Sequence, residues 1–145
     1  MNDRLKQLYQ EVILQHSKQP FQYEKREDAD LIIEANNPVC GDRFTLYCDV
    51  KDGKIENLSF YGHGCAISKA STSILVKKLM GKSLEEILDY APVIQQIIDP
   101  QNEEIVDDPE LAAFEAARFF PERSTCVTLS WEKLFASVEA KLGKA

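Results

Sequence analysis

The chain has 145 residues, of which 44% are hydrophobic and 28% charged, as is ordinary for a soluble globular protein. This length predicts one domain over residues 1–145, with enough chain to bury a core without disulfide help. No apolar run approaches the roughly 18 residues of a membrane helix, and the mixed-charge N-terminus has no apolar signal core, so we expect a cytoplasmic protein. The formal net charge of −7 argues against nucleic-acid binding, because an acidic surface repels phosphate.

The first half of the chain predicts a helix followed by three antiparallel strands. Apolar residues recur at helical spacing from Asp3, the expected N-cap, to Ser17. A short apolar run at residues 31–33 and an alternating pattern over residues 43–50 indicate strands, and Asp52-Gly53 predicts a tight hairpin turn before a returning strand at residues 55–61. Cys48 lies on the apolar face of its strand, where a cysteine usually packs as a small hydrophobic residue.

The second half predicts helices. One is expected over residues 66–80 with Gly81 after its end, and a capping box at Ser83–Glu86 starts another that ends before Pro100. An acidic loop follows at residues 101–108, then a short helix with Pro109 in its first position and a last helix over residues 122–142. The predicted fold class is α+β, with a three-stranded antiparallel sheet covered by about five helices.

Four cysteines and two histidines carry the possible metal chemistry. In a reducing compartment cysteines are expected to bind metals, to react or to pack, rather than to form disulfides. The start of the second strand and the end of the third must lie at the same edge of the sheet, which brings Cys40 and Asp42 close to Cys65. Cys126, in the first turns of the last helix, can approach from above. We therefore predict a metal site formed by Cys40, Asp42, Cys65 and Cys126.

The carboxylate in this set is informative. Three thiolates and one carboxylate suit tetrahedral zinc, and thiolates also suit iron–sulfur chemistry. A hard oxygen ligand leaves a borderline-soft ion more readily than sulfur does, so Asp42 indicates a site that opens. Arg123, one turn before Cys126, can stabilise thiolate or persulfide charge, or it can pair with Glu122. His63 is expected to face solvent rather than to be a fifth ligand, and His16 is expected to be a surface residue.

Three motifs carry a resemblance to a known family. They are Asn-Asn-Pro-Val-Cys-Gly-Asp at 36–42, Gly-His-Gly-Cys-Ala-Ile-Ser-Lys-Ala-Ser at 62–71, and Arg-Ser-Thr-Cys-Val-Thr-Leu-Ser-Trp at 123–131. In this order they resemble the iron–sulfur cluster assembly proteins of the IscU, NifU N-terminal and SufU family, over about residues 3–140. The resemblance is greatest to the SufU branch, because Thr125 stands where the scaffold type has histidine and the stretch before Cys126 is long.

The resemblance implies a zinc protein that accepts persulfide sulfur from a SufS-like, pyridoxal-phosphate cysteine desulfurase and stimulates its turnover. It would be a sulfurtransferase-like partner rather than a stand-alone enzyme, with downstream scaffold proteins as further partners. Cys40 is the implied sulfur acceptor, with Cys126 as the alternative, and Arg123 steadies charge. Two other functions remain open. One is a scaffold that assembles a [2Fe–2S] cluster or holds iron on the same four ligands, and the other is an interaction module with purely structural zinc.

Overall fold

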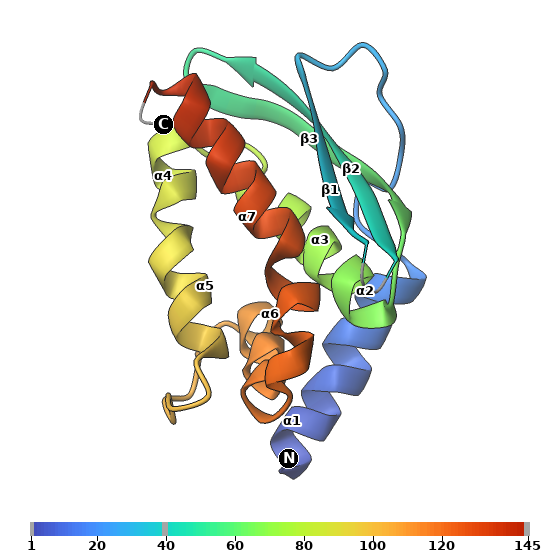
Figure 1. Ribbon diagram of the computed structural model, residues 1–145, viewed down its shortest axis with the longest axis vertical. Coiled ribbons are helices and arrows are strands. Elements are labelled where there is room, and N and C mark those ends of the chain that lie inside the picture. The colour runs from blue at the N-terminus through green and yellow to red at the C-terminus, as the bar shows by residue number, and fades with distance from the viewer. Residues whose placement is uncertain (1, 39–40, 144–145) are drawn as a thin grey trace.

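The computed structural model describes residues 2–38 and 41–143, and its sheet is the predicted one (Figure 1). Strands β1 (Leu31–Asn37), β2 (Asp42–Lys51) and β3 (Lys54–His63) pair in the order β1-β2-β3, and both pairings are antiparallel. Arg43 of β2 pairs with His63 of β3, so the start of one strand lies beside the end of the other. This register places the first two candidate motifs at one edge of the sheet.

A tight turn joins β2 to β3. Asp52 and Gly53 both have positive φ, 54° and 74°, which is the backbone of the two-residue hairpin that this dipeptide predicts. Phe44, Leu46 and Cys48 alternate along β2 and are at most 1% exposed, so this face of the sheet belongs to the core. The packing role predicted for Cys48 agrees with that placement.

Two helices cover this face of the sheet: α3 (Ala66–Leu79) and α7 (Ser124–Lys141). They pack against each other as well as against the strands, and Trp131 of α7 is fully buried between them and their neighbours. Removing a side chain of this kind from water contributes roughly 1.5–3 kcal/mol. Gly81, with φ of +84°, follows α3 as predicted. The α3–α7 pair therefore fixes how Cys65 and Cys126 lie relative to each other.

The N-terminal helix is a continuous run of α1 (Asp3–Leu8), a π-helical segment η1 (Tyr9–Ile13) and α2 (Leu14–Lys18). Its N-cap is Asn2, whose Oδ1 accepts a hydrogen bond from the Leu5 N–H at 2.9 Å, and not the predicted Asp3, which lies in the first turn. Either residue type can cap a helix, and the sequence does not decide between neighbours.

The prediction that His16 is a surface residue was wrong. Its Nδ1 lies 2.7 Å from Ser73 Oγ of α3 and its Nε2 lies 2.6 Å from a carboxylate oxygen of Glu110. The imidazole is half-buried because it links the N-terminal helix to α3 and to the segment at Glu110. Long-range partners of this kind leave no mark on local periodicity.

The remaining helices lie between α3 and α7 in the chain. The predicted capping box at Ser83–Glu86 is present and opens α4 (Leu84–Leu88), but the helix pauses at Asp89 before α5 (Tyr90–Ile98). Pro92 explains the pause, because its ring nitrogen cannot donate to the Leu88 carbonyl one turn earlier. After the acidic loop come α6 (Pro109–Ala112), η2 (Ala113–Phe119) and η3 (Pro121–Arg123).

Taken with the N-terminal run, α3 and α7, the α4–α5 and α6–η2 pairs give about five helical bodies, as predicted. The last α-helix begins at Ser124 rather than 122, because residues 121–123 form a 3₁₀ turn. Within residues 2–38 and 41–143, no helix is long and apolar enough to span a bilayer.

Candidate metal centre

Three elements meet at the predicted site. Asp42 is the first residue of β2, Cys65 is the N-cap of α3, and Cys126 is the third residue of α7. One carboxylate oxygen and the two sulfur atoms all lie within 4.8 Å of one another. Asp42 is 1% exposed and Cys126 is 5% exposed, whereas Cys65 is partly open to solvent. Cys40, the fourth predicted ligand, lies outside the described residues.

The donor set fits a tetrahedral metal ion. Two ligands about 2.3 Å from one ion lie about 3.8 Å apart at the tetrahedral angle, so the three donor atoms need shift by only about 1 Å. Two thiols and one carboxylate suit zinc and are also compatible with iron–sulfur ligation. A cation between the buried Asp42 carboxylate and the two sulfurs would contact all three donor atoms at once.

The local backbone holds the Asp42 carboxylate and the Cys65 sulfur in place. The Cys65 N–H donates to Asp42 Oδ1 at 3.0 Å, which ties β2 to the start of α3. The Ser68 N–H donates to Cys65 Sγ at 3.4 Å, as expected for the N3 position of a helix whose N-cap is cysteine. The Ser68 hydroxyl also lies 3.4 Å from that sulfur. The single hydrogen of that hydroxyl is donated to the Cys65 carbonyl at 3.1 Å, so the Ser68 N–H is the donor to the sulfur. The Cys65 sulfur thus lies at the positive end of α3.

Gly64 provides the space that brings these groups together. A Cβ at this position would lie 2.6 Å from Ser68 Oγ, 2.7 Å from Asp42 Oδ1 and 2.7 Å from a ring carbon of Phe44. Every one of these distances is too short for a carbon atom. The glycine at this position of the second motif is therefore a steric requirement of the site.

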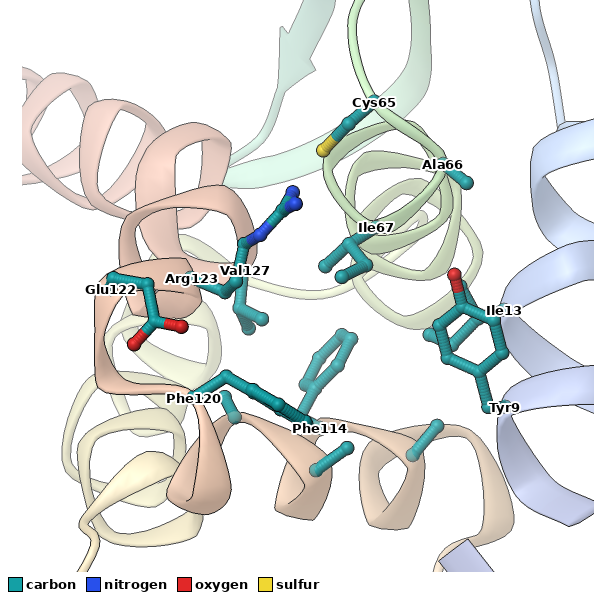
Figure 2. A pocket seen from close by; sticks show the side chains of 13 residues that line it. Tyr9, Ile13, Cys65, Ala66, Ile67, Phe114, Phe120, Glu122, Arg123 and Val127 are labelled. Carbon is teal, nitrogen blue, oxygen red and sulfur yellow. The ribbon is translucent and has the colours of Figure 1, made fainter. Parts of the chain in front are cut away.

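Arg123 points at the centre from the turn before α7. Figure 2 shows its guanidinium directed toward the Cys65 sulfur, while the Glu122 carboxylate points elsewhere. Hydrogen bonding to Cys126, followed by the charges of Cys126 and Cys65, raises the pKa of Arg123 above its ordinary value. Of the two partners that the sequence left open for Arg123, the thiols are thus the principal ones.

A cavity of about 460 Å³ opens beside Cys65 and Arg123 (Figure 2). Its walls are mostly apolar and come from the N-terminal run, the start of α3, the η2 segment and the start of α7. Phe120, on its rim, is 45% exposed. The cavity gives a second molecule access to the Cys65 side of the centre, since Asp42 and Cys126 are nearly closed to solvent.

Two residues that could have competed for this role lie elsewhere. His63 is exposed and its ring stands edge-on to Tyr61, with 6.3 Å between ring centroids, as expected for a solvent-facing residue. Cys48 is fully buried in the core, and burial raises the pKa of its thiol to about 12. Such a thiol stays protonated and unreactive at neutral pH.

The sequence reasoning missed the part played by Ser68. This residue lies within the second motif, but the sequence pattern alone assigned it no part in the metal site. The available signal was its spacing, because the third residue after an N-cap donates its N–H to the capping side chain. Once Cys65 is recognised as an N-cap, Ser68 follows as its hydrogen-bond donor.

An antiparallel sheet with helices on one face and a Cys/Asp cluster at its edge defines an α+β protein with a candidate metal centre, and comparison with known proteins identifies the family. The chain belongs to the NifU-like N terminal domain family, which matches residues 8–140. Proteins of this family act in iron–sulfur cluster assembly, so the expected family membership is confirmed.

Curated relatives carry two different functional names. An iron–sulfur cluster assembly scaffold protein IscU from Streptococcus pyogenes is 34% identical, over 94% of this chain and 86% of its own length. A zinc-dependent sulfurtransferase SufU from Bacillus subtilis is 32% identical, over 98% and 97%.

Solved structures support the fold. A putative assembly scaffold protein of the SUF system from Fervidobacterium islandicum is 30% identical and superposes with a TM-score of 0.77, over 91% of this chain and 97% of the other. A NifU-like N-terminal domain from Brucella abortus has a TM-score of 0.81 over 99% of this chain and 100% of the other, but at 17% identity it shows the fold alone.

Proposed function

We propose that this protein is a zinc-dependent sulfur acceptor, which takes persulfide sulfur from a cysteine desulfurase and thereby stimulates desulfurase turnover. The observation that carries the proposal is the grouping of Asp42, Cys65 and Cys126 within 4.8 Å, with Arg123 directed at the two sulfurs. Cys40 completes the set by its place in the sequence, two residues before Asp42. The full-length similarity to a zinc-dependent sulfurtransferase supports the same function.

In this proposal the four ligands are Cys40, Asp42, Cys65 and Cys126. Bound zinc would keep the cysteines deprotonated and protected from oxidation. Cys65 and Cys126 are carried by two packed helices and hold the site. The Asp42 oxygen is the ligand that dissociates most easily, so the site can open without losing its two helix-borne sulfurs.

The transfer itself is a thiol–persulfide exchange. A thiolate of this chain attacks the terminal sulfur of the donor's persulfide, a new S–S bond forms as the donor's S–S bond breaks, and the donor leaves as a thiolate. No net oxidation or reduction occurs. Cys40 is the proposed acceptor by analogy with the family. Cys126 remains the alternative, although its 5% exposure makes it hard for a donor to reach.

Arg123 and the neighbouring cavity suit the approach of such a donor. The guanidinium is exposed, and it offers a positive charge to an incoming persulfide at the edge of the centre. The apolar walls of the cavity can accept a protein segment on the same side. The proposed partner is therefore a SufS-like cysteine desulfurase, with downstream scaffold proteins as recipients of the sulfur.

Two features of this chain favour sulfur transfer over cluster scaffolding. Thr125 is exposed in the first turn of α7 and brings no imidazole to the centre, where the scaffold type has histidine. By comparison with the scaffold type, the segment presented to the chaperone is replaced here by Phe119-Phe120-Pro121-Glu122-Arg123. A [2Fe–2S] scaffold is the second candidate function, because relatives of similar identity carry that name.

Alanine release by the matching desulfurase, measured with and without the purified zinc-loaded protein, tests the proposal. We expect stimulation that is lost in Cys40→Ala and reduced about tenfold or more in Arg123→Gln. Arg43→Gln serves as the control, since it removes an exposed positive charge next to Asp42 without touching the sulfurs. Absent stimulation, together with a stable iron–sulfur chromophore after reconstitution, would establish the scaffold function instead.

A further inference from the structure

A line of buried hydroxyl groups runs from the metal centre into the interface between α3 and α7. Ser68, Thr72 and Ser130 are each at most 3% exposed. On α3, Cys65, Ser68 and Thr72 follow one another at intervals of three and four residues and share one face. On α7, Cys126 and Ser130 are four residues apart and also share a face. The two cysteine-bearing faces meet at these hydroxyls.

The contact between the two helices is a direct hydrogen bond. Thr72 Oγ1 and Ser130 Oγ lie 2.7 Å apart, and Thr72 also donates to the Ser68 carbonyl at 2.9 Å. Thr72 has one hydroxyl hydrogen, so with that hydrogen on the Ser68 carbonyl it is Ser130 that donates to Thr72. The bond therefore joins the two helices about two turns after Cys65 on α3 and one turn after Cys126 on α7.

A second connection lies beside the first. Ser71 accepts a hydrogen bond from the Trp131 indole N–H at 2.9 Å and donates to the Val127 carbonyl at 2.6 Å. Val127 directly follows Cys126 in the chain. Burying a hydroxyl group without a hydrogen-bond partner is unfavourable. The hydroxyls that form these two connections have partners on the facing helix. These hydrogen bonds fix the position of α7 along α3. Apolar contacts alone are less directional and would define that position less precisely.

We infer that Thr72 and Ser130 are positioning residues for the metal centre, which lock α3 to α7 so that the Cys65 and Cys126 sulfurs stay at ligand spacing when the other ligands exchange. The inference rests on the proposed metal centre. Its physical basis is that a metal ion accepts two sulfurs only over a narrow range of separations, and a slide of α7 along α3 would change that separation directly. Asp42 comes from the sheet and is outside this connection.

Cobalt(II) binding tests the inference without any sulfur-transfer assay. The metal-free protein is titrated with cobalt under conditions in which it is folded, affinity is measured by chelator competition, and the thiolate absorption bands report the geometry. We expect Thr72→Val and Ser130→Ala each to weaken binding about tenfold and to alter the bands. The double variant should be little worse than either single variant, because both remove the same bond. Thr72→Ser, which keeps the hydroxyl, should restore wild-type behaviour.

Ser73→Ala is the matched control. Ser73 is a fully buried serine of the same helix, but its partners are His16 and the Phe21 N–H rather than α7. Its loss should lower the melting temperature of the metal-free protein comparably while leaving cobalt affinity within about twofold. If Ser73→Ala weakens binding as much as Ser130→Ala does, the hydroxyls are merely stabilising and the inference is overturned.

Further outcomes separate the inference from the proposed function. A folded Thr72→Ser variant that loses the cobalt bands would also overturn the positioning role. Ser130→Ala removes a single oxygen atom and is the variant to rely on if Thr72→Val does not fold. Equal affinity in wild type and Ser130→Ala refutes the inference alone. A wild-type protein that binds neither cobalt nor zinc refutes the metal centre itself.

Discussion

Gly64 lies between the Asp42 carboxylate and the start of α3, in a space too small for a side chain. We expect Gly64→Ala to push the carboxylate away and break its hydrogen bond with the Cys65 N–H. Overpacking of this kind costs about 1–3 kcal/mol, and metal affinity should fall at least tenfold. Zinc content after gel filtration and a denaturant melt measure both effects.

Gly81→Ala is the control for Gly64→Ala. Gly81 has a φ of +84° in open space, so alanine there is strained but meets no atom within 4 Å. The free energy of unfolding of the Gly81→Ala variant should fall by about 1 kcal/mol, and its zinc content should be unchanged. Equal zinc content in both variants would show that the Gly64 contacts do not matter for the site.

Cys48 and Cys65 should differ sharply in reactivity, because Cys48 is buried in the core and Cys65 is partly exposed. Burial raises the pKa of Cys48 to about 12, whereas Cys65 is partly exposed at the edge of the cavity. A thiol reagent at pH 7.5 should label Cys65 in the metal-free protein and leave Cys48 unmodified until the chain unfolds. Peptide mapping by mass spectrometry gives the result, and labelling of native Cys48 would contradict its assigned burial.

At the same scale, the grouping of the candidate ligands Asp42, Cys65 and Cys126 was easier to predict from the sequence than the contacts that support them, and their role as ligands stays a prediction. Asp42 and Cys65 followed from hairpin geometry, which depends on local turn chemistry at Asp52 and Gly53. Cys126 rested on the last helix and on the family resemblance, because nothing local says where a helix 60 residues later will pack. Ser68 and the Thr72–Ser130 bond depend on the α3–α7 pairing and were not predicted.

At the scale of elements, Glu110 links the N-terminal helix to α3 through polar contacts with both. It accepts from His16 at 2.6 Å and pairs with Lys77 at 3.1 Å. Burial raises the pKa of Glu110, but the hydrogen bonds from His16 and Lys77 outweigh it and hold the pKa below its ordinary value. A carboxyl whose pKa is depressed by folding stabilises the protein above its unfolded pKa, and this contribution is lost as the pH falls through the folded value.

The wild-type protein should therefore lose about 1 kcal/mol more stability than Glu110→Gln between pH 5 and roughly pH 3. Urea melts of the metal-free proteins across this range measure the difference. Glu103→Gln, an exposed acidic residue in the preceding loop, should follow the wild-type curve. Parallel curves for wild type and Glu110→Gln would show that this carboxylate adds nothing to the docking of the helix.

The order and type of the elements were largely predictable, because periodicity, capping boxes and turn dipeptides are local. The missed details were long-range or subtle. His16 was misplaced because its partners lie on other elements, and the pause at Asp89 depends on the position of Pro92 within a helix. The π-helical segment Tyr9–Ile13 carries no periodicity signal distinct from its α-helical flanks. The single-domain organisation over residues 1–145 stays a prediction.

At the scale of the whole molecule, the candidate ligands join the sheet edge, α3 and α7, so metal binding should stabilise the entire fold. A ligand that binds the native state at 1,000 times its dissociation constant adds about 4 kcal/mol of stability. For a chain of this size that corresponds to roughly 10 °C in melting temperature. We therefore expect a strong chelator to lower the melting temperature of the zinc-loaded protein by about this amount, as followed by circular dichroism, and added zinc to restore it.

The Cys126→Ser variant separates loss of metal from other effects of the chelator. It removes one of the two helix-borne sulfurs, so its melting temperature should lie near that of the metal-free protein and change little on chelation. Cys48→Ala is the second control: it leaves the centre intact, so its melting temperature should fall on chelation by as much as that of the wild type. If the chelator leaves the melting temperature of zinc-containing wild-type protein unchanged, the ion binds somewhere other than at these three elements.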